Sequence, residues 1–383
     1  MEWIDSPTVV ALVAAVAGLV FVVARLVVVA HGHPSVFIVV GNQNLTRGSL
    51  PRGIAITPQS GYDGQFYYRM ALDPLDFART AFGIRFDTFS RLERIGYPAI
   101  AWILAGGQRS LVPATLIITN VIALGALGFG GGLLARNSGR HAMWGLALAG
   151  YWGYLWSAGR DLTEITAAAF LALGLYCYRR DRSWLAGVLL LCAVLSKETA
   201  VYVVVVIALT RVIRWVMRQD PRPPGTIDVA WGLPLVGFAI WQLIVHAGTG
   251  TFPLTASGQA NLGTPFVGIV DGLREFLPHP FHVASLLWLG EFAVLAIVVV
   301  AAALSIRSSS APLHERLAWV SVVVLTVCIA PAIWLGKVGF RSLDDVYLFS
   351  WIVLLGTSRR LWPLGAIVGV TWLVVAVQLI KFV

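Results

Sequence analysis

Charged residues are scarce in this chain of 383 residues: Asp, Glu, Lys and Arg make up 12% of it, whereas soluble domains contain about 25%. Hydrophobic residues make up 58%, and the mean hydropathy is +0.79. This composition argues against a soluble globular fold and excludes a disordered chain. The apolar runs are continuous and do not alternate with polar residues, which excludes an outer-membrane barrel. We therefore expect an all-α, polytopic integral membrane protein.

Cysteine is equally scarce. The three cysteines, Cys177, Cys192 and Cys328, all lie inside apolar stretches. Such residues behave as small buried hydrophobic groups. Their number and placement argue against both a disulfide framework and a cysteine metal cluster.

Long apolar runs are what the sequence does contain. A spanning helix needs about 20 apolar residues. By that length we predict about eleven membrane spans, near residues 7–30, 110–135, 141–158, 161–178, 184–196, 199–217, 226–246, 284–306, 316–336, 342–358 and 361–381. The first run is longer than the apolar core of a signal peptide, roughly 7–15 residues, so we expect it to be retained as the first span.

The net charge of +9 follows a topological pattern. Thirteen arginines fall in every second connection, and the short connections between these hold four positive residues. This bias predicts that the thirteen face the cytoplasm, with the N-terminus inside and the C-terminus outside. The positive charge therefore needs no nucleic-acid partner. The thirteen are Arg136, Arg140, Arg179, Arg180, Arg182, Arg211, Arg214, Arg218, Arg222, Arg307, Arg316, Arg359 and Arg360.

We expect one transmembrane domain over residues 1–383, with two long extracytoplasmic segments at 31–94 and 247–283. Both contain too many Gly, Pro and polar residues to span a membrane. Residues 77–95 alternate apolar side chains with arginines. This pattern predicts amphipathic helices in the first segment that lie in the membrane interface.

The charged residues near the outer ends of the spans mix acids with bases. Charges at or within spans are costly and usually mark function, although each one taken singly fits a snorkelling or solvated side chain equally well. Together they predict a polar cavity that opens outward. The acids and bases concerned include Arg25, Asp63, Arg69, Asp161, Glu164, Lys197, Glu198, Lys337 and Arg341.

Asp63 lies between Gly61-Tyr62 and Gly64. Glycines on either side predict a tight turn that lets a substrate approach the backbone closely. The carboxylate could act as a general base that deprotonates an acceptor hydroxyl, and the nearby aromatic rings could stack on a sugar or lie at the headgroup level. The alternative is a purely structural Asp in a glycine turn.

Three segments carry a family resemblance: GYDGQFYYRMALDP at 61–74, YPAIAWILA at 97–105 and SKETA at 196–200. With the long first outer loop and its acidic residue, they resemble bacterial members of the GT-C superfamily of membrane glycosyltransferases. The resemblance covers residues 25–200 in pattern. It implies an enzyme that takes a sugar from a polyprenyl-phosphate donor at the outer face of the membrane.

The same resemblance implies roles for individual residues. Asp63 would be the catalytic base of an inverting single displacement, in which polyprenyl phosphate leaves as the acceptor hydroxyl attacks. The departing phosphate needs cationic stabilisation, for which the candidates are Arg25, Arg69, Lys197, Lys337 and Arg341. Candidates for binding the acceptor or the sugar are Tyr62, Gln65, Tyr67, Asp161, Glu164 and Glu198.

No cofactor is required by this reasoning, but a divalent metal is an open alternative, because some GT-C relatives use one. Asp161, Glu164 and Glu198 could hold it, or pair with the cations instead. Asp344 and Asp345 form a plausible pair of oxygen ligands, or simply an acidic helix N-terminus.

Two further expectations concern partners and location. The chain shows no large soluble domain, which favours a lipid or glycan acceptor, or a partner subunit that binds the acceptor. Its Ala-, Val-, Gly-, Arg- and Trp-rich composition is typical of a GC-rich bacterium, so we expect the cytoplasmic membrane. A transporter or lipid flippase predicts internal repeats and charges at the membrane midplane, which we do not find. A non-catalytic scaffold in cell-envelope assembly is the third alternative.

Overall fold

The computed structural model describes residues 5–46, 50–58, 60–220, 222–256, 261–336 and 339–381. These ranges are mostly helical. The helices are α1 (Pro7–Val28), α2 (Gly64–Leu72), α3 (Gly96–Leu104), α4 (Val112–Asn137), α5 (Gly145–Ala149), α6 (Gly153–Ala158), α7 (Glu164–Arg179), α8 (Ser183–Ser196), α9 (Ala200–Val216), α10 (Val229–Thr249), α11 (Pro253–Ala256), α12 (Val267–Phe276), α13 (Val283–Ala303), α14 (Leu313–Val327), α15 (Pro331–Trp334), α16 (Asp344–Leu355) and α17 (Trp362–Lys381).

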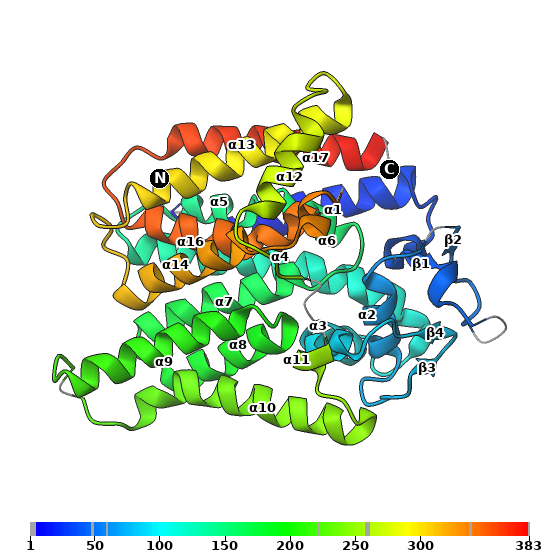
Figure 1. The fold of residues 1–383 in the computed structure, drawn as a ribbon, viewed down its shortest axis with the longest axis horizontal. Coiled ribbons are helices and arrows are strands. Elements are labelled where there is room, and N and C mark those ends of the chain that lie inside the picture. The colour runs from blue at the N-terminus through cyan, green and yellow to red at the C-terminus, as the bar shows by residue number, and fades with distance from the viewer. Residues whose placement is uncertain are drawn as a thin grey trace.

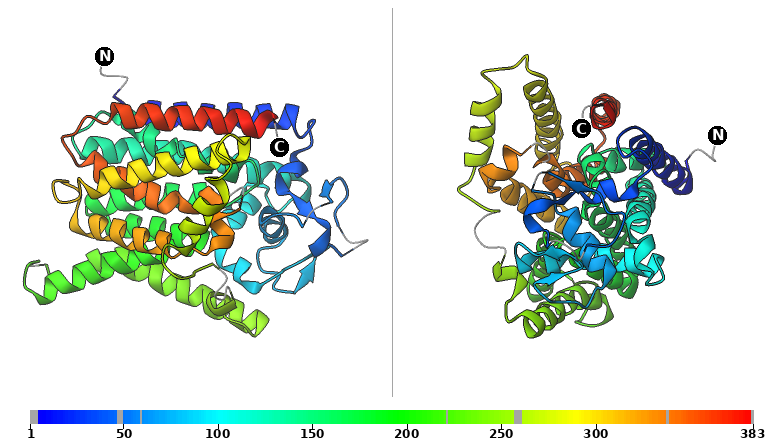
Figure 2. Two further views of the ribbon diagram at one scale, coloured as in Figure 1. Left: turned by 45° about the horizontal axis from the view of Figure 1, so that its top comes forward. Right: turned by 90° about the vertical axis from the view of Figure 1, so that its right-hand side faces the viewer.

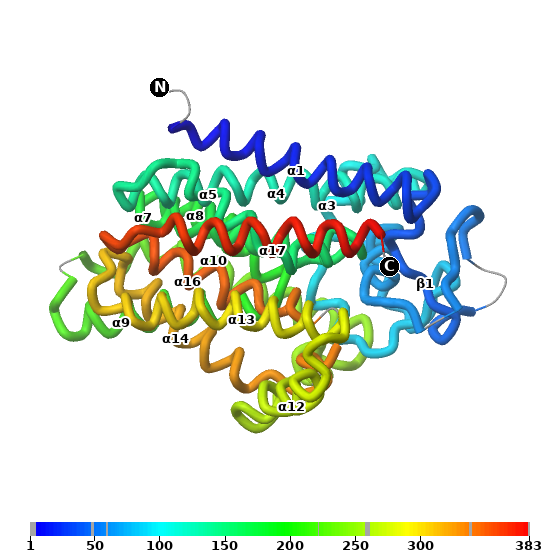
Figure 3. Tube along the Cα trace, turned by 90° about the horizontal axis from the view of Figure 1, so that it is seen from above, coloured from blue at the N-terminus to red at the C-terminus, as the bar shows by residue number. Residues whose placement is uncertain are grey.

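The long helices form a bundle in which their axes lie roughly parallel, with chain directions that alternate (Figures 1 and 3). Helix α4 lies inside the bundle and packs against α1, α5 and α7, while α16 packs against α13 and α14. Helix α1 begins at one end of the bundle and α17 finishes at the other (Figure 2). The bundle therefore has two distinct ends, and the connections between helices lie at one end or the other.

Five helical segments are long and apolar enough to cross a membrane: those that contain α1, α4, α10, α13 and α17. Four of them, all except α4, are at most one-third buried in the protein. Their outward faces carry large apolar side chains such as Leu12, Leu243 and Val370. Apolar surface of this extent needs a non-aqueous environment. The all-α class and the membrane character predicted from composition are therefore supported by the structure.

The remaining predicted spans contain shorter helices: α7 has 16 residues, α8 has 14, α9 has 17, α14 has 15 and α16 has 12. Every residue of α16 is buried. A helix enclosed by other helices needs neither the length nor the continuous apolar surface of one that faces lipid. By length and composition the described ranges support five spans, and the full count of eleven stays a proposal.

Two predicted spans are not single helices: 316–336 contains α14 and the short α15, and 141–158 divides more evenly. Residues 141–158 form a short 3₁₀ turn, then α5 and α6, with a break at Gly150–Trp152. At the break the Tyr151 ring stacks on Tyr347, with centroids 4.5 Å apart. The Tyr151 hydroxyl donates a hydrogen bond to the carbonyl oxygen of Phe340. These contacts with another part of the chain replace helical continuation, and no local pattern encodes them.

The first long segment, 31–94, covers one end of the bundle with mixed structure. It contains α2 and two small sheets: β1 (Val40–Gly41) pairs in parallel with β2 (Ile56–Thr57), and β3 (Thr80–Ala81) pairs antiparallel with β4 (Ile84–Arg85). All nine residues of α2 are buried. The prediction of amphipathic interfacial helices is wrong here, because residues 77–95 form the β3–β4 hairpin and the 3₁₀ helix Phe89–Arg94. Their apolar side chains pack into a second core that includes Phe66, Phe86 and Tyr97.

In the second long segment, 247–283, the described residues contain the short helix α11 and the ten-residue helix α12. Helix α12 packs on α15 and α13. Gly272 is needed at this contact, because a Cβ there would overlap the Trp288 ring.

Candidate active site

Asp63 immediately precedes α2, and its carbonyl oxygen accepts hydrogen bonds from the amides of Phe66 and Tyr67. Gly61 has a φ of +79°, a conformation that favours glycine. A Cβ on Gly64 would overlap the carbonyl oxygen of Arg160. The two glycines were expected to admit a substrate. In the structure they instead let the chain pack closely on itself, which fixes the position of Asp63.

The Asp63 carboxylate lies between two guanidinium groups. Arg341 Nη2 donates to its Oδ2 at 2.6 Å, and Arg91 Nη1 lies 3.0 Å from its Oδ1. Burial alone would raise the pKa of Asp63, but Arg91, Arg341 and Arg94 outweigh it and lower the pKa to about 2. The carboxylate is therefore ionised at neutral pH, and both of its oxygens face cations.

Asp63 lines a cavity of about 580 Å³, within the roughly 300–1,000 Å³ range of small-molecule sites. Five other predicted site residues line the same cavity: Tyr62, Glu164, Lys197, Glu198 and Arg341. They come from segments that are far apart in sequence. The structure thus brings half of the predicted site residues to one cavity.

Arg341 connects three of these groups. Its guanidinium pairs with Asp63 and Glu164, and its Nε donates to the Tyr62 hydroxyl at 3.0 Å. Glu164 in turn accepts a hydrogen bond of 3.0 Å from Ser157. Arg341 is 8% exposed. Two carboxylates already neutralise the charge of this nearly buried arginine, so another anion would have to displace one of them to bind its N–H donors.

Arg91 and Arg94 were not assigned a role from the sequence. Arg94 binds Glu198 through two hydrogen bonds of 2.7 Å and donates to the Tyr67 hydroxyl at 2.9 Å. The Glu198 pKa is low, about 2, because Arg94 outweighs the effect of burial. The missed signal was two arginines three positions apart in a segment that was otherwise interpreted as an interfacial helix.

Lys197 contacts the two acids at the start of α16. Its Nζ pairs with Asp344 and lies 2.8 Å from Asp345, and the Thr199 hydroxyl donates to Asp345 at 2.6 Å. Both acids are in the first turn of α16, where they also complement the helix dipole. Lys197 therefore joins the α8–α9 turn to α16 at the cavity wall.

The cavity is amphipathic. Four cations and four carboxylates line its polar wall, so its charges balance: Arg91, Arg94, Lys197, Arg341, Asp63, Glu164, Glu198 and Asp345. An apolar part of the lining comes from α14 and its neighbours, with side chains that include Val322, Leu325, Ile329 and Ile333. Such a cavity fits a ligand with a polar, charged part joined to an apolar part.

Other predicted residues lie away from this cavity. Arg69 is 1% exposed and donates to the carbonyl oxygens of Ala78 and Arg79. Gln65 accepts a hydrogen bond from the Gly41 amide. Both side chains therefore hold the 31–94 segment together. The sequence had instead suggested phosphate binding for Arg69 and acceptor or sugar binding for Gln65. Tyr67 does not line the cavity, but its hydroxyl accepts a hydrogen bond from Arg94, which does.

Arg25 and Asp161 are also buried away from the cavity lining. Arg25 Nη1 donates to the carbonyl oxygen of Leu379 at 2.6 Å, which joins α1 to α17. The Asp161 carboxylate oxygens have no hydrogen-bond partner among the described residues. Lys337, the remaining predicted phosphate ligand, lies outside the described residues.

The donor set does not fit a metal ion. Within the described ranges no group of three or more His, Cys, Asp or Glu side chains could hold one. The carboxylates of the cavity, including the Asp345 considered above, each face an arginine or a lysine. Cationic side chains thus occupy the positions that a metal would need.

No family model, curated protein or solved structure matches this chain.

Proposed function

We propose that this protein is a membrane glycosyltransferase that moves a sugar from a polyprenyl-phosphate donor to a lipid or glycan acceptor, with Asp63 as the general base. One observation carries the proposal: the Asp63 carboxylate lies between Arg91 and Arg341 in a cavity with a charged wall and an apolar wall. A base, phosphate-binding cations and a surface for an isoprenoid chain are then in one place.

The donor fits the two kinds of lining. Its phosphodiester is an anion, and the guanidinium groups of Arg341 and Arg91, which pair with Asp63 in this structure, would turn from it to bind the phosphate. Its isoprenoid chain would lie along the apolar wall from Val322 to Ile333. Of the donor ligands expected from sequence, Arg341 and Lys197 line the cavity. The proposal leaves out Arg25 and Arg69, because their guanidinium groups bind backbone carbonyl oxygens elsewhere.

The reaction is a single displacement that inverts the anomeric carbon. Asp63 takes the proton of the acceptor hydroxyl as that oxygen forms a bond to the anomeric carbon. The bond from this carbon to the phosphate oxygen breaks, and its electron pair leaves with polyprenyl phosphate. Arg341 and Arg91 stabilise the charge that develops on the phosphate.

Asp63 needs the donor in order to act as a base. A carboxylate with a pKa of about 2 accepts a proton poorly. A bound phosphate would compete for the guanidinium groups of Arg91 and Arg341. As these turn toward the phosphate, the Asp63 pKa rises toward its ordinary value. The ion pairs thus keep the base inactive until the donor has bound.

Glu164, Glu198 and Tyr62 surround the remaining space and would orient the acceptor through hydrogen bonds to sugar hydroxyls. Glu198 is held rigidly by two hydrogen bonds from Arg94, which suits a positioning role. A separate subunit that presents the acceptor is compatible with this arrangement.

We further propose eleven spans in a bacterial cytoplasmic membrane, with the Asp63 end outward. The arginine-rich turns meet one another at the opposite end of the bundle. There Arg179 contacts Asn137 and Glu315, and Arg140 contacts the carbonyl oxygens of Thr357 and Arg359. Clustered arginines at one end are typical of the cytoplasmic side.

The test is transfer from a panel of radiolabelled polyprenyl-phosphate sugars by the purified protein, with lipid and glycan extracts as acceptors. Asp63→Asn preserves the shape of the side chain and removes the base. We expect its transfer rate to be lower by about 100-fold or more. The matched control is Asp181→Asn, an exposed residue at the other end of the bundle, which should match the wild type.

Three outcomes would contradict parts of the proposal. Equal rates for wild type and Asp63→Asn would remove Asp63 as the base. Absence of transfer from every donor by a well-folded wild type would argue against the enzyme class. Movement of the intact donor between the two leaflets of a vesicle membrane, without transfer of its sugar, would favour a flippase.

A further inference from the structure

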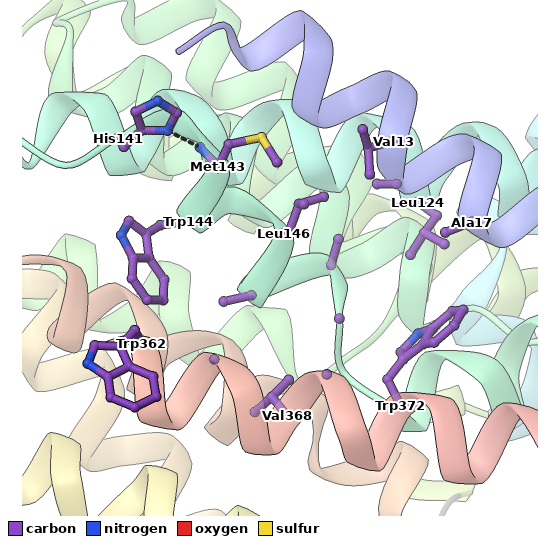
Figure 4. Close-up of a pocket in the computed structure, with 16 residues that line it drawn as sticks. Val13, Ala17, Leu124, His141, Met143, Trp144, Leu146, Trp362, Val368 and Trp372 are labelled. Carbon is purple, nitrogen blue, oxygen red and sulfur yellow. Dashed lines mark hydrogen bonds between the residues drawn. The ribbon is translucent and has the colours of Figure 1, made fainter. Parts of the chain in front are cut away.

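A second cavity of about 580 Å³ lies between α1, α5 and α17, away from Asp63. Its lining is apolar apart from His141. Figure 4 shows α1 along one side with Val13 and Ala17, α17 along the other with Val368, and Leu146 between them. The proposed glycosyl transfer makes no use of this cavity.

Small residues create its space. Ala14 and Ala17 of α1, Gly150 after α5, and Gly365 and Gly369 of α17 all line it. Gly369 is exposed, and a Cβ there would meet no atom of the described residues within 4 Å. A space of this size is larger than the voids between packed helices, so a molecule from outside the chain can occupy it.

Two tryptophans flank one end of the cavity. Trp144 and Trp362 lie there beside His141, while Trp372 lies at the far end (Figure 4). Trp362 is 66% exposed. Tryptophan prefers the level of lipid headgroups. This places the Trp144–Trp362 end at a membrane surface and the rest of the cavity at the depth of the acyl chains.

Cations surround this same end. Arg140 donates to the carbonyl oxygen of Arg359 at 2.9 Å, which joins the turn before α5 to the turn before α17. Arg359 and Arg360 are exposed and are separated from Trp362 by Leu361. Arg136 is also half-exposed nearby, 3.9 Å from Asp5. The end of an apolar cavity thus carries a positive cluster at headgroup depth.

We propose that this cavity binds the acyl chains of an anionic phospholipid whose phosphate lies against Arg359 and Arg360. The apolar lining takes the chains, the tryptophans lie at the glycerol level and the arginines select the headgroup. The positive charge argues against a second copy of this chain as the occupant, because two copies would bring like charges together. The inference is independent of the glycosyltransferase proposal.

The experiment is native mass spectrometry of the full-length protein in detergent, with phosphatidylglycerol or phosphatidylcholine of identical acyl chains. We expect phosphatidylglycerol to bind more tightly. Each arginine near the surface should contribute about fivefold. The double variant Arg359→Gln/Arg360→Gln should therefore lose most of the preference. The matched control is Arg274→Gln, an exposed arginine on α12, which should retain it.

A second variant tests the cavity itself. Gly369→Phe fills the open space between α17 and α1 and should reduce binding of both lipids while the melting temperature stays within a few degrees. Equal binding of the two lipids by the wild type would overturn the proposal, as would unchanged binding by Gly369→Phe. A dimer that Gly369→Phe disrupts would identify a second copy as the occupant.

Discussion

At the scale of single residues, the candidate site depends on how carboxylates and guanidinium groups are paired. Asp63 has two arginine partners, Glu198 has one that binds it twice, and Glu93 has an acid as its neighbour. Burial raises the pKa of all three acids, but arginines outweigh it at Asp63 and Glu198 and leave only the pKa of Glu93 raised. Two predictions follow from this contrast.

The Asp63 ion pairs should stabilise the fold in a pH-dependent way. The Asp63 pKa is about 2 in the folded protein and about 3.9 in an unfolded chain. Its stabilisation, about 3 kcal/mol, is fully present above pH 4 and is lost as the pH falls through 2. Asp63→Asn should thus melt well below the wild type at pH 7, and the difference should shrink to about a third at pH 2.5. A constant difference in melting temperature would contradict this.

Glu93 should behave in the opposite sense. Burial, and then the charge of Glu198, raise its pKa to about 8. Since the unfolded chain releases this proton near pH 4.5 and the folded protein near pH 8, the free energy of unfolding falls across that interval. Glu93→Gln removes this loss, so its advantage over the wild type should grow from pH 4.5 to pH 8 and then level off. The control is Glu275→Gln on α12, which replaces an exposed acid. Its free energy of unfolding should follow that of the wild type at every pH.

At the scale of elements, glycines determine where helices approach other backbone. The start of α2 touches the carbonyl oxygens of Arg160 and Ile38 at Gly64, which leaves no room for a side chain. In contrast, a Cβ on Gly232 of α10 would meet no atom of the described part of the chain within 4 Å. The two positions make a matched pair, because both are helical glycines.

We expect Gly64→Ala to destabilise the protein by about 1–3 kcal/mol, since the added methyl group overpacks the contact. It should also displace Asp63 and lower any transferase activity. Gly232→Ala should be neutral or stabilise by up to about 1 kcal/mol, because alanine favours a helix. Melting temperatures of both variants in the same detergent test this, and equal values would refute the packing argument.

Helix positions could largely be predicted from the sequence, because hydropathy over 20 residues is a local property. Ten of the eleven predicted apolar segments each contain one principal helix. The exception, residues 141–158, breaks where Tyr151 makes contacts with Phe340 and Tyr347. Residues 77–95 were also misinterpreted, since their apolar side chains pack into a local core and not into a membrane interface.

At the scale of the whole molecule, the bundle separates two kinds of surface. The peripheral helices α1, α10, α13 and α17 are apolar and exposed, while α7 and α16 are enclosed. One end carries the Asp63 cavity and the other carries the arginine-rich turns. This polarity makes the proposed orientation testable.

Cysteines introduced at the two ends should differ in their access to reagent. Leu75, 69% exposed, lies at the Asp63 end, and Ser358 is exposed at the arginine-rich end. In intact bacterial cells a membrane-impermeant maleimide should label Leu75→Cys, and it should label Ser358→Cys only after the membrane is permeabilised. The reverse pattern would show that the orientation is opposite to the one proposed. Labelling of both cysteines in intact cells would contradict an odd number of spans between the two positions.

The sequence by itself determined the class of protein and most helix positions, because both depend on apolar composition within short windows. It also singled out Asp63, whose glycine neighbours are adjacent in the chain. Only the tertiary structure decided which charges meet. Arg341 pairs with Asp63 across 278 positions of sequence, and Arg94 pairs with Glu198 across 104. Such pairs depend on how the helices pack, and a single sequence holds no local signal of that packing.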